Sequence, residues 1–162
     1  MIRAANQNNI SQVLLTVFKQ EIRVNYYLIV AGCLSAAAAL IHVGCILFGA
    51  PWYRFFGAGE QMAVMAERGL IKPTIITSCI VIVLSIWSLY AFSAAGIIRR
   101  LPFIRLALIV ISLIYIARGL AGFYFASNPI GRTPEFWVWS SMICLFIGLV
   151  HLIGLKQQWP VL

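Results

Sequence analysis

The sequence contains no aspartate, and its acidic residues are limited to Glu21, Glu60, Glu67 and Glu135. Charged residues make up 10% of the chain, whereas a soluble domain carries about 25%. Phosphoryl-transfer sites that hold two metal ions are built from several carboxylates, so this class of enzyme lacks its ligands here. The composition therefore favours a protein that is not an enzyme.

Other enzyme and binding classes lack their motifs as well. The four cysteines form no Cys-x-x-Cys pair, which disfavours a thiol–disulfide oxidoreductase. No Gly-x-Ser-x-Gly elbow is present, and no acid at a suitable depth completes a Ser–His pair. The net charge is +8, but the basic residues lie singly or in pairs beside apolar runs, where Lys and Arg set membrane orientation. We therefore expect no nucleic-acid partner.

Four long apolar runs dominate the sequence. Each is about 20 residues long, which is the length that a helix needs to cross a bilayer core of about 30 Å. They cover residues 26–48, 74–95, 103–125 and 136–155. The sequence predicts an all-α integral membrane four-helix bundle over residues 26–162, in contact with lipid. The first run begins too late and is too long for a cleavable signal peptide, so we expect it to remain as an anchor.

Residues 1–25 form a separate segment before the first span. From Ile10 to Ile22, apolar residues recur at helical spacing, and Lys19 and Arg23 fall mainly on the other side. This pattern predicts an amphipathic helix in the membrane interface, with its basic groups facing anionic headgroups. A cytoplasmic extension of the first span explains the pattern equally well.

The distribution of Lys and Arg predicts the orientation. Seven lie on the side of the two termini and the 96–102 connection, and four lie on the other side, so both termini should be cytoplasmic. The 49–73 connection is then outside, and Glu60–Arg68 should form a short helix that starts with an acid and ends before Gly69. The shortness of the 96–102 connection predicts a tight antiparallel hairpin of the second and third spans.

A charged residue inside the third span is the main clue to a site. Arg118 lies about 10 Å from the outer end of its span, and His42 lies about 9 Å from the outer end of the first span. An ionised group at this depth needs a counter-charge, and Glu60 is the best candidate on the outer side. We expect an outward-facing polar pocket lined by Arg118, His42, Glu60 and Tyr115, with Tyr53 or Trp52 as a lid. Alternatively, Arg118 extends to the interface or forms a purely structural ion pair.

Metal and haem sites have weaker support. His42 and Cys45 are three residues apart on one helix face, and Cys79 lies at comparable depth, so the three could bind a soft metal such as Cu(I) or Zn(II). A haem held by His42 and His151 is disfavoured, because these residues differ by about 15 Å in depth across the bilayer core. We expect no metal and no cofactor.

The stretch LYAFSAAGIIRRLPFIRLALIVISLIYIARGL, residues 89–120, resembles small, uncharacterised four-span proteins of bacterial inner membranes. The resemblance covers the end of the second span, the hairpin turn and most of the third span. It implies a bacterial inner membrane and the hairpin. It implies no activity and assigns no functional residue.

Together these features favour a non-enzymatic membrane protein, an accessory or binding subunit that takes a partner or a small anionic amphiphile at its outer face. Other membrane subunits or further copies of the chain are the expected protein partners. One alternative is a subunit of an oligomeric transporter or channel, although the second span offers only Cys79 and Tyr90 as ionisable groups. The other alternative is a redox component that binds haem or a metal.

Overall fold

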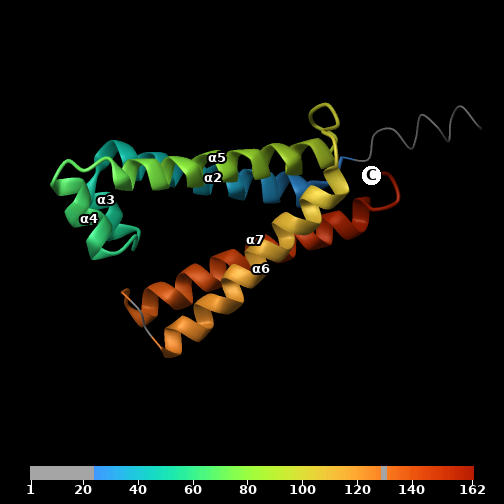
Figure 1. Ribbon diagram of the computed structural model, residues 1–162. Coiled ribbons are helices and arrows are strands. Elements are labelled where there is room, and N and C mark those ends of the chain that lie inside the picture. Colours follow the sequence, from blue (N-terminus) through green and yellow to red (C-terminus); the bar gives the residue numbers. More distant parts are fainter. Residues whose placement is uncertain (1–23, 129–130) are drawn as a thin grey trace, which may run out of the picture.

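The computed structural model describes residues 24–128 and 131–162, and every regular element in this part of the chain is a helix (Figure 1). The all-α prediction is confirmed. The four long helices are α2 (Tyr26–Phe48), α5 (Lys72–Ala94), α6 (Ile104–Ser127) and α7 (Pro134–Gln158). All four are long and apolar enough to cross a membrane, and many large apolar side chains along them are exposed, as contact with lipid requires.

Two short helices connect α2 to α5. They are α3 (Ala50–Phe55) and α4 (Glu60–Glu67), and α4 covers the stretch in which the sequence analysis places a short helix. The bounds of the long helices differ from the predicted spans by at most three residues. The predicted amphipathic helix, from Ile10 to Ile22, lies outside the described residues, and only Val24 and Asn25 of the predicted segment 1–25 are described.

Asn25 fixes the start of α2 and joins it to the end of α7. Its side-chain oxygen accepts a hydrogen bond from the backbone N–H of Leu28 at 3.0 Å, which caps the helix. Its amide nitrogen donates to the carbonyl of Gly154 at 3.4 Å and to the side chain of Gln157 at 3.1 Å. One buried side chain therefore satisfies a free helix end and connects two spans.

Glycine faces determine which helices pair. Gly32 of α2 lies so close to the ring of Phe92 on α5 that an added Cβ would be 2.8 Å from it, and Ser88 donates to the Gly32 carbonyl at 2.9 Å. On α6, an added Cβ at Gly119 would lie 2.5 Å from Leu145 of α7. Such small residues let helix backbones approach closely in lipid. The bundle is therefore built from two antiparallel pairs, α2 with α5 and α6 with α7 (Figure 1).

The 96–102 connection does not create the tight hairpin that its length predicts. It is compact, because the Ser93 hydroxyl donates to the carbonyl of Arg99 and accepts from the backbone N–H of Leu101, both at 2.9 Å. However, α5 and α6 belong to different pairs, and they diverge from this connection (Figure 1). Close backbone contact at the glycines within each pair outweighs the shortness of the connection.

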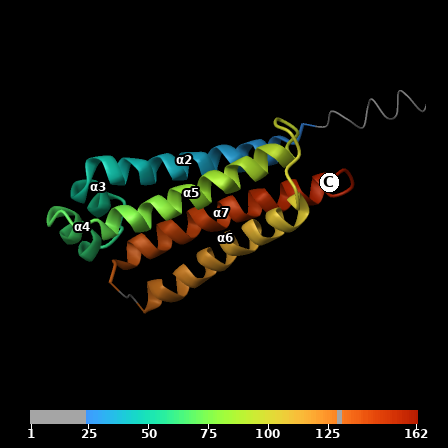
Figure 2. The same cartoon turned by 45° about the horizontal axis from the view of Figure 1, so that its top comes forward.

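The two pairs meet mainly at one end of the bundle. We call this the C-terminal end, and we call the other the α3–α4 end, where α3, α4 and the connection between α6 and α7 lie; both views show this arrangement (Figures 1 and 2). The core near the C-terminal end contains Leu28, Leu108 and Leu155 from three different helices. Toward the α3–α4 end the pairs diverge (Figure 1).

We expect Gly154→Ala to destabilise the contact between the pairs. An added Cβ would lie 2.6 Å from the Leu28 side chain and 3.2 Å from its backbone nitrogen, and Leu28 is fully buried and has no room to move. Overpacking of this kind costs about 1–3 kcal/mol. The measurement is thermal unfolding in detergent, with Ile153→Ala at an exposed neighbouring position as the control. Equal melting temperatures for the two variants would contradict the packing described here.

Candidate functional site

Arg118 of α6 reaches across to the first turns of α7. Its Nη2 donates to the hydroxyl of Ser140 at 3.2 Å, and its Cζ lies 5.2 Å from the centre of the Trp137 ring, within cation–π range. An added Cβ at Gly122 would lie 3.0 Å from Nη1 of Arg118, so the absence of a side chain there leaves room for the guanidinium. Arg118 thus extends toward the α3–α4 end, but its guanidinium ends in contact with α7. Its partner Ser140 lies about 9 Å along α7 from the first residue of that helix.

A second arginine lies against the same indole ring. Arg132, in the connection between α6 and α7, has its Cζ 5.6 Å from the Trp137 ring centre and 4.7 Å from that of Phe136. Its Nη2 donates to the carbonyl of Ala58 at 2.9 Å. Burial lowers the pKa of Arg132, and the positive charge of Arg118 lowers this pKa further. The two cations therefore lie close enough to repel each other.

This cluster of two arginines contains no acidic side chain. Among the described residues, neither Arg118 nor Arg132 forms an ion pair with a carboxylate. The indole N–H of Trp137 is buried and has no hydrogen-bond partner in the same part of the chain. We call Arg118, Arg132, Trp137 and Ser140 the arginine site. It holds two cations beside one aromatic ring, and guanidinium groups are donors that recognise an anion.

Glu60 does not supply the counter-charge expected for Arg118. Its carboxylate binds Arg54 instead, with the Nη2–Oε1 distance at 2.7 Å, and Glu67 binds the Nη1 of the same guanidinium at 2.5 Å. Arg54 lies in the last turn of α3, whereas the two acids lie at the two ends of α4. The hydrogen bonds from Arg54 lower the pKa of both carboxyls. This exposed triad joins the two short helices, and its two carboxylates form ion pairs with Arg54 and not with Arg118 or Arg132.

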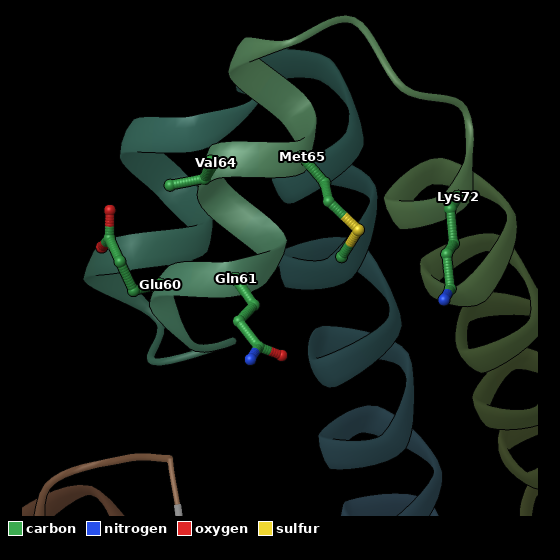
Figure 3. A pocket seen from close by; sticks show the side chains of 5 residues that line it. All are labelled: Glu60, Gln61, Val64, Met65 and Lys72. Atoms are coloured by element: carbon green, nitrogen blue, oxygen red, sulfur yellow. The ribbon is translucent and has the colours of Figure 1, made fainter.

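The side of α4 facing the start of α5 carries a shallow hollow of about 400 Å³ (Figure 3). Its lining residues are Glu60, Gln61, Val64, Met65 and Lys72. Met65 and Lys72 extend into the space between α4 and α5, whereas Glu60 lies on the far side of α4 (Figure 3). The hollow is wide open and contains no residue of the arginine site, so it is not the predicted pocket.

Tyr115 lies in the core. Its hydroxyl forms a 3.0 Å hydrogen bond with the hydroxyl of Ser35, and its ring contacts those of Trp87 and His151 with centroid distances of 4.9 and 5.5 Å. Only 5% of Tyr115 is exposed. It therefore joins α6 to the other three long helices, one turn below Arg118, and does not line an open pocket.

Tyr53 and Trp52, the expected lid, attach α3 to the α2–α5 pair. The hydroxyl of Tyr53 is hydrogen-bonded to that of Thr77 at 3.0 Å, and both residues are buried. Trp52 stacks on Phe48 with ring centres 4.5 Å apart, and its ring lies over Gly44. Neither side chain covers Arg118.

His42 is half-buried on α2, and its Nδ1 is hydrogen-bonded to the carbonyl of Ala38 at 2.7 Å. Of its two proposed metal co-ligands, Cys45 is buried and Cys79 is exposed. The described residues contain no group of three or more His, Cys, Asp or Glu side chains that could hold a metal ion, so the structure does not bring these three together.

No family model, curated protein or solved structure matches this chain, so the site is interpreted from its own geometry. Sequence reasoning identified Arg118 but missed Arg132, Trp137 and Ser140. The spacing of Trp137 and Ser140 places them near one another on α7, yet an aromatic residue at a span end usually indicates the membrane interface. Nothing in the sequence of the connection indicated that Arg132 folds back over the same ring.

We expect acid to weaken the α3–α4 junction. The pKa of Glu60 and of Glu67 is lower in the folded protein than the usual value of about 4.3, so their contribution is complete above that pH and is lost as the pH falls through the lowered pKa. Hydrogen exchange of α4 amides, corrected for intrinsic rates, should show less protection at pH 3 than at pH 6. Glu60→Gln with Glu67→Gln should remove this difference.

Glu135→Gln is the matched control for that experiment, because Glu135 is exposed and forms no ion pair with any described residue. It should leave the pH dependence of α4 protection unchanged. Protection of α4 that is the same at both pH values in the unaltered protein would contradict a role for the Arg54 triad.

Proposed function

We propose that this is a non-enzymatic integral membrane protein that binds an anionic group of a partner or small amphiphile at the arginine site. The observation that supports this most directly is the pair of guanidinium groups on one indole ring without a carboxylate from the described residues. Positive charge held among apolar side chains is unfavourable unless something compensates it. A bound anion would provide this compensation.

The donors of the site suit a phosphate or carboxylate. Arginine carries several N–H donors in a planar fork, and such forks bind the oxygens of these groups in pairs. Arg118 uses one donor for Ser140 and Arg132 uses one for Ala58, so each guanidinium keeps donors for a ligand. The hydroxyl of Ser140 and the indole N–H of Trp137 add neutral donors beside them.

The proposed setting follows from the charge distribution. The count along the sequence, seven Lys and Arg on the side of the two termini against four on the other side, supports cytoplasmic termini and an outward-facing arginine site. The resemblance of residues 89–120 supports a bacterial inner membrane. As an accessory or binding subunit, the protein would present its α3–α4 end to other membrane subunits or to further copies of itself.

We expect Arg118→Gln and Arg132→Gln each to weaken the binding of dodecyl phosphate, measured by isothermal titration calorimetry in a neutral detergent. Hydrogen bonds to charged groups are worth about 1.5–3 kcal/mol, so each loss should be about tenfold or more. Arg118→Lys should recover part of the affinity, because it keeps the charge and loses the fork.

Arg105→Gln provides a matched control. Arg105 also lies over an indole, with its Cζ 5.3 Å from the centre of the Trp159 ring, and it also makes a hydrogen bond, to the Trp159 carbonyl. It lies at the C-terminal end, so its loss should leave the affinity unchanged. Equal affinities for all four variants and the unaltered protein would exclude the arginine site as the binding site.

A further inference from the structure

Each of the two helix pairs has a face that packs against the other pair. Side chains on these faces become exposed toward the α3–α4 end. Ile147 of α7 belongs to the core and is 4% exposed, whereas Ile143, one helical turn nearer that end, is 56% exposed. On α5, Leu84 belongs to the same core and is 8% exposed, whereas Ile80, again one turn further, is 39% exposed. Burial is thus lost at the same level on both pairs.

The same change occurs on α2. Ser35 is fully buried against Tyr115, and His42, two turns further along the same face, is only half-buried. The exposure agrees with the divergence of the two pairs toward the α3–α4 end (Figure 1). We call His42, Ile80 and Ile143 the inter-pair surface. It contains two large apolar side chains and one imidazole.

At the α3–α4 end itself, the pairs meet again through their connections. The guanidinium of Arg132 donates to the carbonyl of Ala58, and the ring of Phe136 lies against Gly57, where an added Cβ would be 2.1 Å from a ring carbon. Gly57 also has a φ of 68°, a backbone conformation that residues with a side chain rarely adopt. These contacts cover the arginine site from that end of the bundle, whereas its flanks carry exposed apolar side chains.

We propose that the ligand of the arginine site is an anionic bilayer lipid, whose headgroup binds Arg118 and Arg132 while an acyl chain lies on the inter-pair surface. This inference rests on the proposed function and specifies its ligand. His42 faces the chain from α2, and Ile80 and Ile143 contact it from α5 and α7. The lipid enters from the side, through the bilayer, because the connections cover the end.

The negative charge of the headgroup, and not the acyl chain, sets the preference for this lipid. An acyl chain that moves from the bilayer onto the inter-pair surface exchanges one apolar environment for another, so the move contributes little binding free energy. The headgroup exchanges water for two cations that have no carboxylate partner among the described residues. A free phosphate would find the same cations but would have to pass the covered end. A second copy of the chain offers few acids, since the sequence has four acidic residues against twelve Lys and Arg.

The test is native mass spectrometry of the purified protein with phosphatidylglycerol, phosphatidylcholine or inorganic phosphate. We expect retention of phosphatidylglycerol to exceed that of phosphatidylcholine about tenfold, and Arg118→Gln to abolish this preference. His42→Trp should fill part of the inter-pair surface and reduce retention of phosphatidylglycerol about tenfold. Ile80→Trp provides a second obstruction, should the first variant fail to fold.

Ile41→Trp and Ile86→Trp are the controls, because both residues are exposed and lie on helix faces turned away from the inter-pair surface. They should retain phosphatidylglycerol like the unaltered protein. If the Arg118 variant loses anion binding while His42→Trp and Ile80→Trp behave like their controls, the lipid inference is wrong and the proposed function stands.

Three other outcomes would also overturn the inference. Retention of inorganic phosphate that matches that of phosphatidylglycerol would identify a free anion as the ligand. A mass that corresponds to two chains, and that His42→Trp reduces to one chain without changing lipid retention, would identify a second copy on the inter-pair surface. Equal retention of both lipids by the unaltered protein and by Arg118→Gln would overturn the proposed function together with the inference.

Discussion

The arginine site depends on the contact of two guanidinium groups with one indole ring. Trp137 provides a π face that attracts both Arg118 and Arg132, which offsets part of their mutual repulsion. An aromatic ring does not replace a carboxylate, and no acid of the described residues forms an ion pair with either group. The site therefore retains an excess of positive charge, and this excess is what makes it suited to an anion.

The fold creates this site through the close packing of α6 and α7. Glycine at position 119 lets the two backbones approach, and glycine at position 122 leaves space for the guanidinium of Arg118 beside Ser141 and Ser140. The α3–α4 unit then contributes from the other pair, because the carbonyl of Ala58 positions Arg132.

Much of the fold was predictable from the sequence, because each span is recognisable from its own length and apolar character. The four long helices follow directly from the runs, and Asn25 and Pro134 lie where helix starts favour them. The pairing was not predictable in the same way. Chain proximity favoured a hairpin of α5 and α6, but the contacts that decide the pairing join glycines to residues far away in the sequence, such as Gly32 and Phe92.

The candidate site was predictable only in part, for a related reason. A charged residue within an apolar run, such as Arg118, is recognisable from the sequence alone, but its partners depend on how the helices and connections fold. Glu60 was a reasonable counter-charge by side and by depth, yet Arg54 is six residues away in the chain and already binds it. Arg132 belongs to the site because its guanidinium lies over the Trp137 ring while it donates to the carbonyl of Ala58, which is a contact with the other helix pair.

The most direct measurement of the central claim is the proximity of phosphorus to arginine nitrogen in solid-state NMR. The protein, labelled with ¹⁵N at arginine side chains, would be reconstituted with an anionic phospholipid, and dipolar recoupling would detect nitrogens near ³¹P. We expect dephasing of guanidinium signals, and we expect the dephased signals to be missing in Arg118→Gln and Arg132→Gln. Dephasing that is unchanged in these variants and is lost only in Arg105→Gln would contradict it.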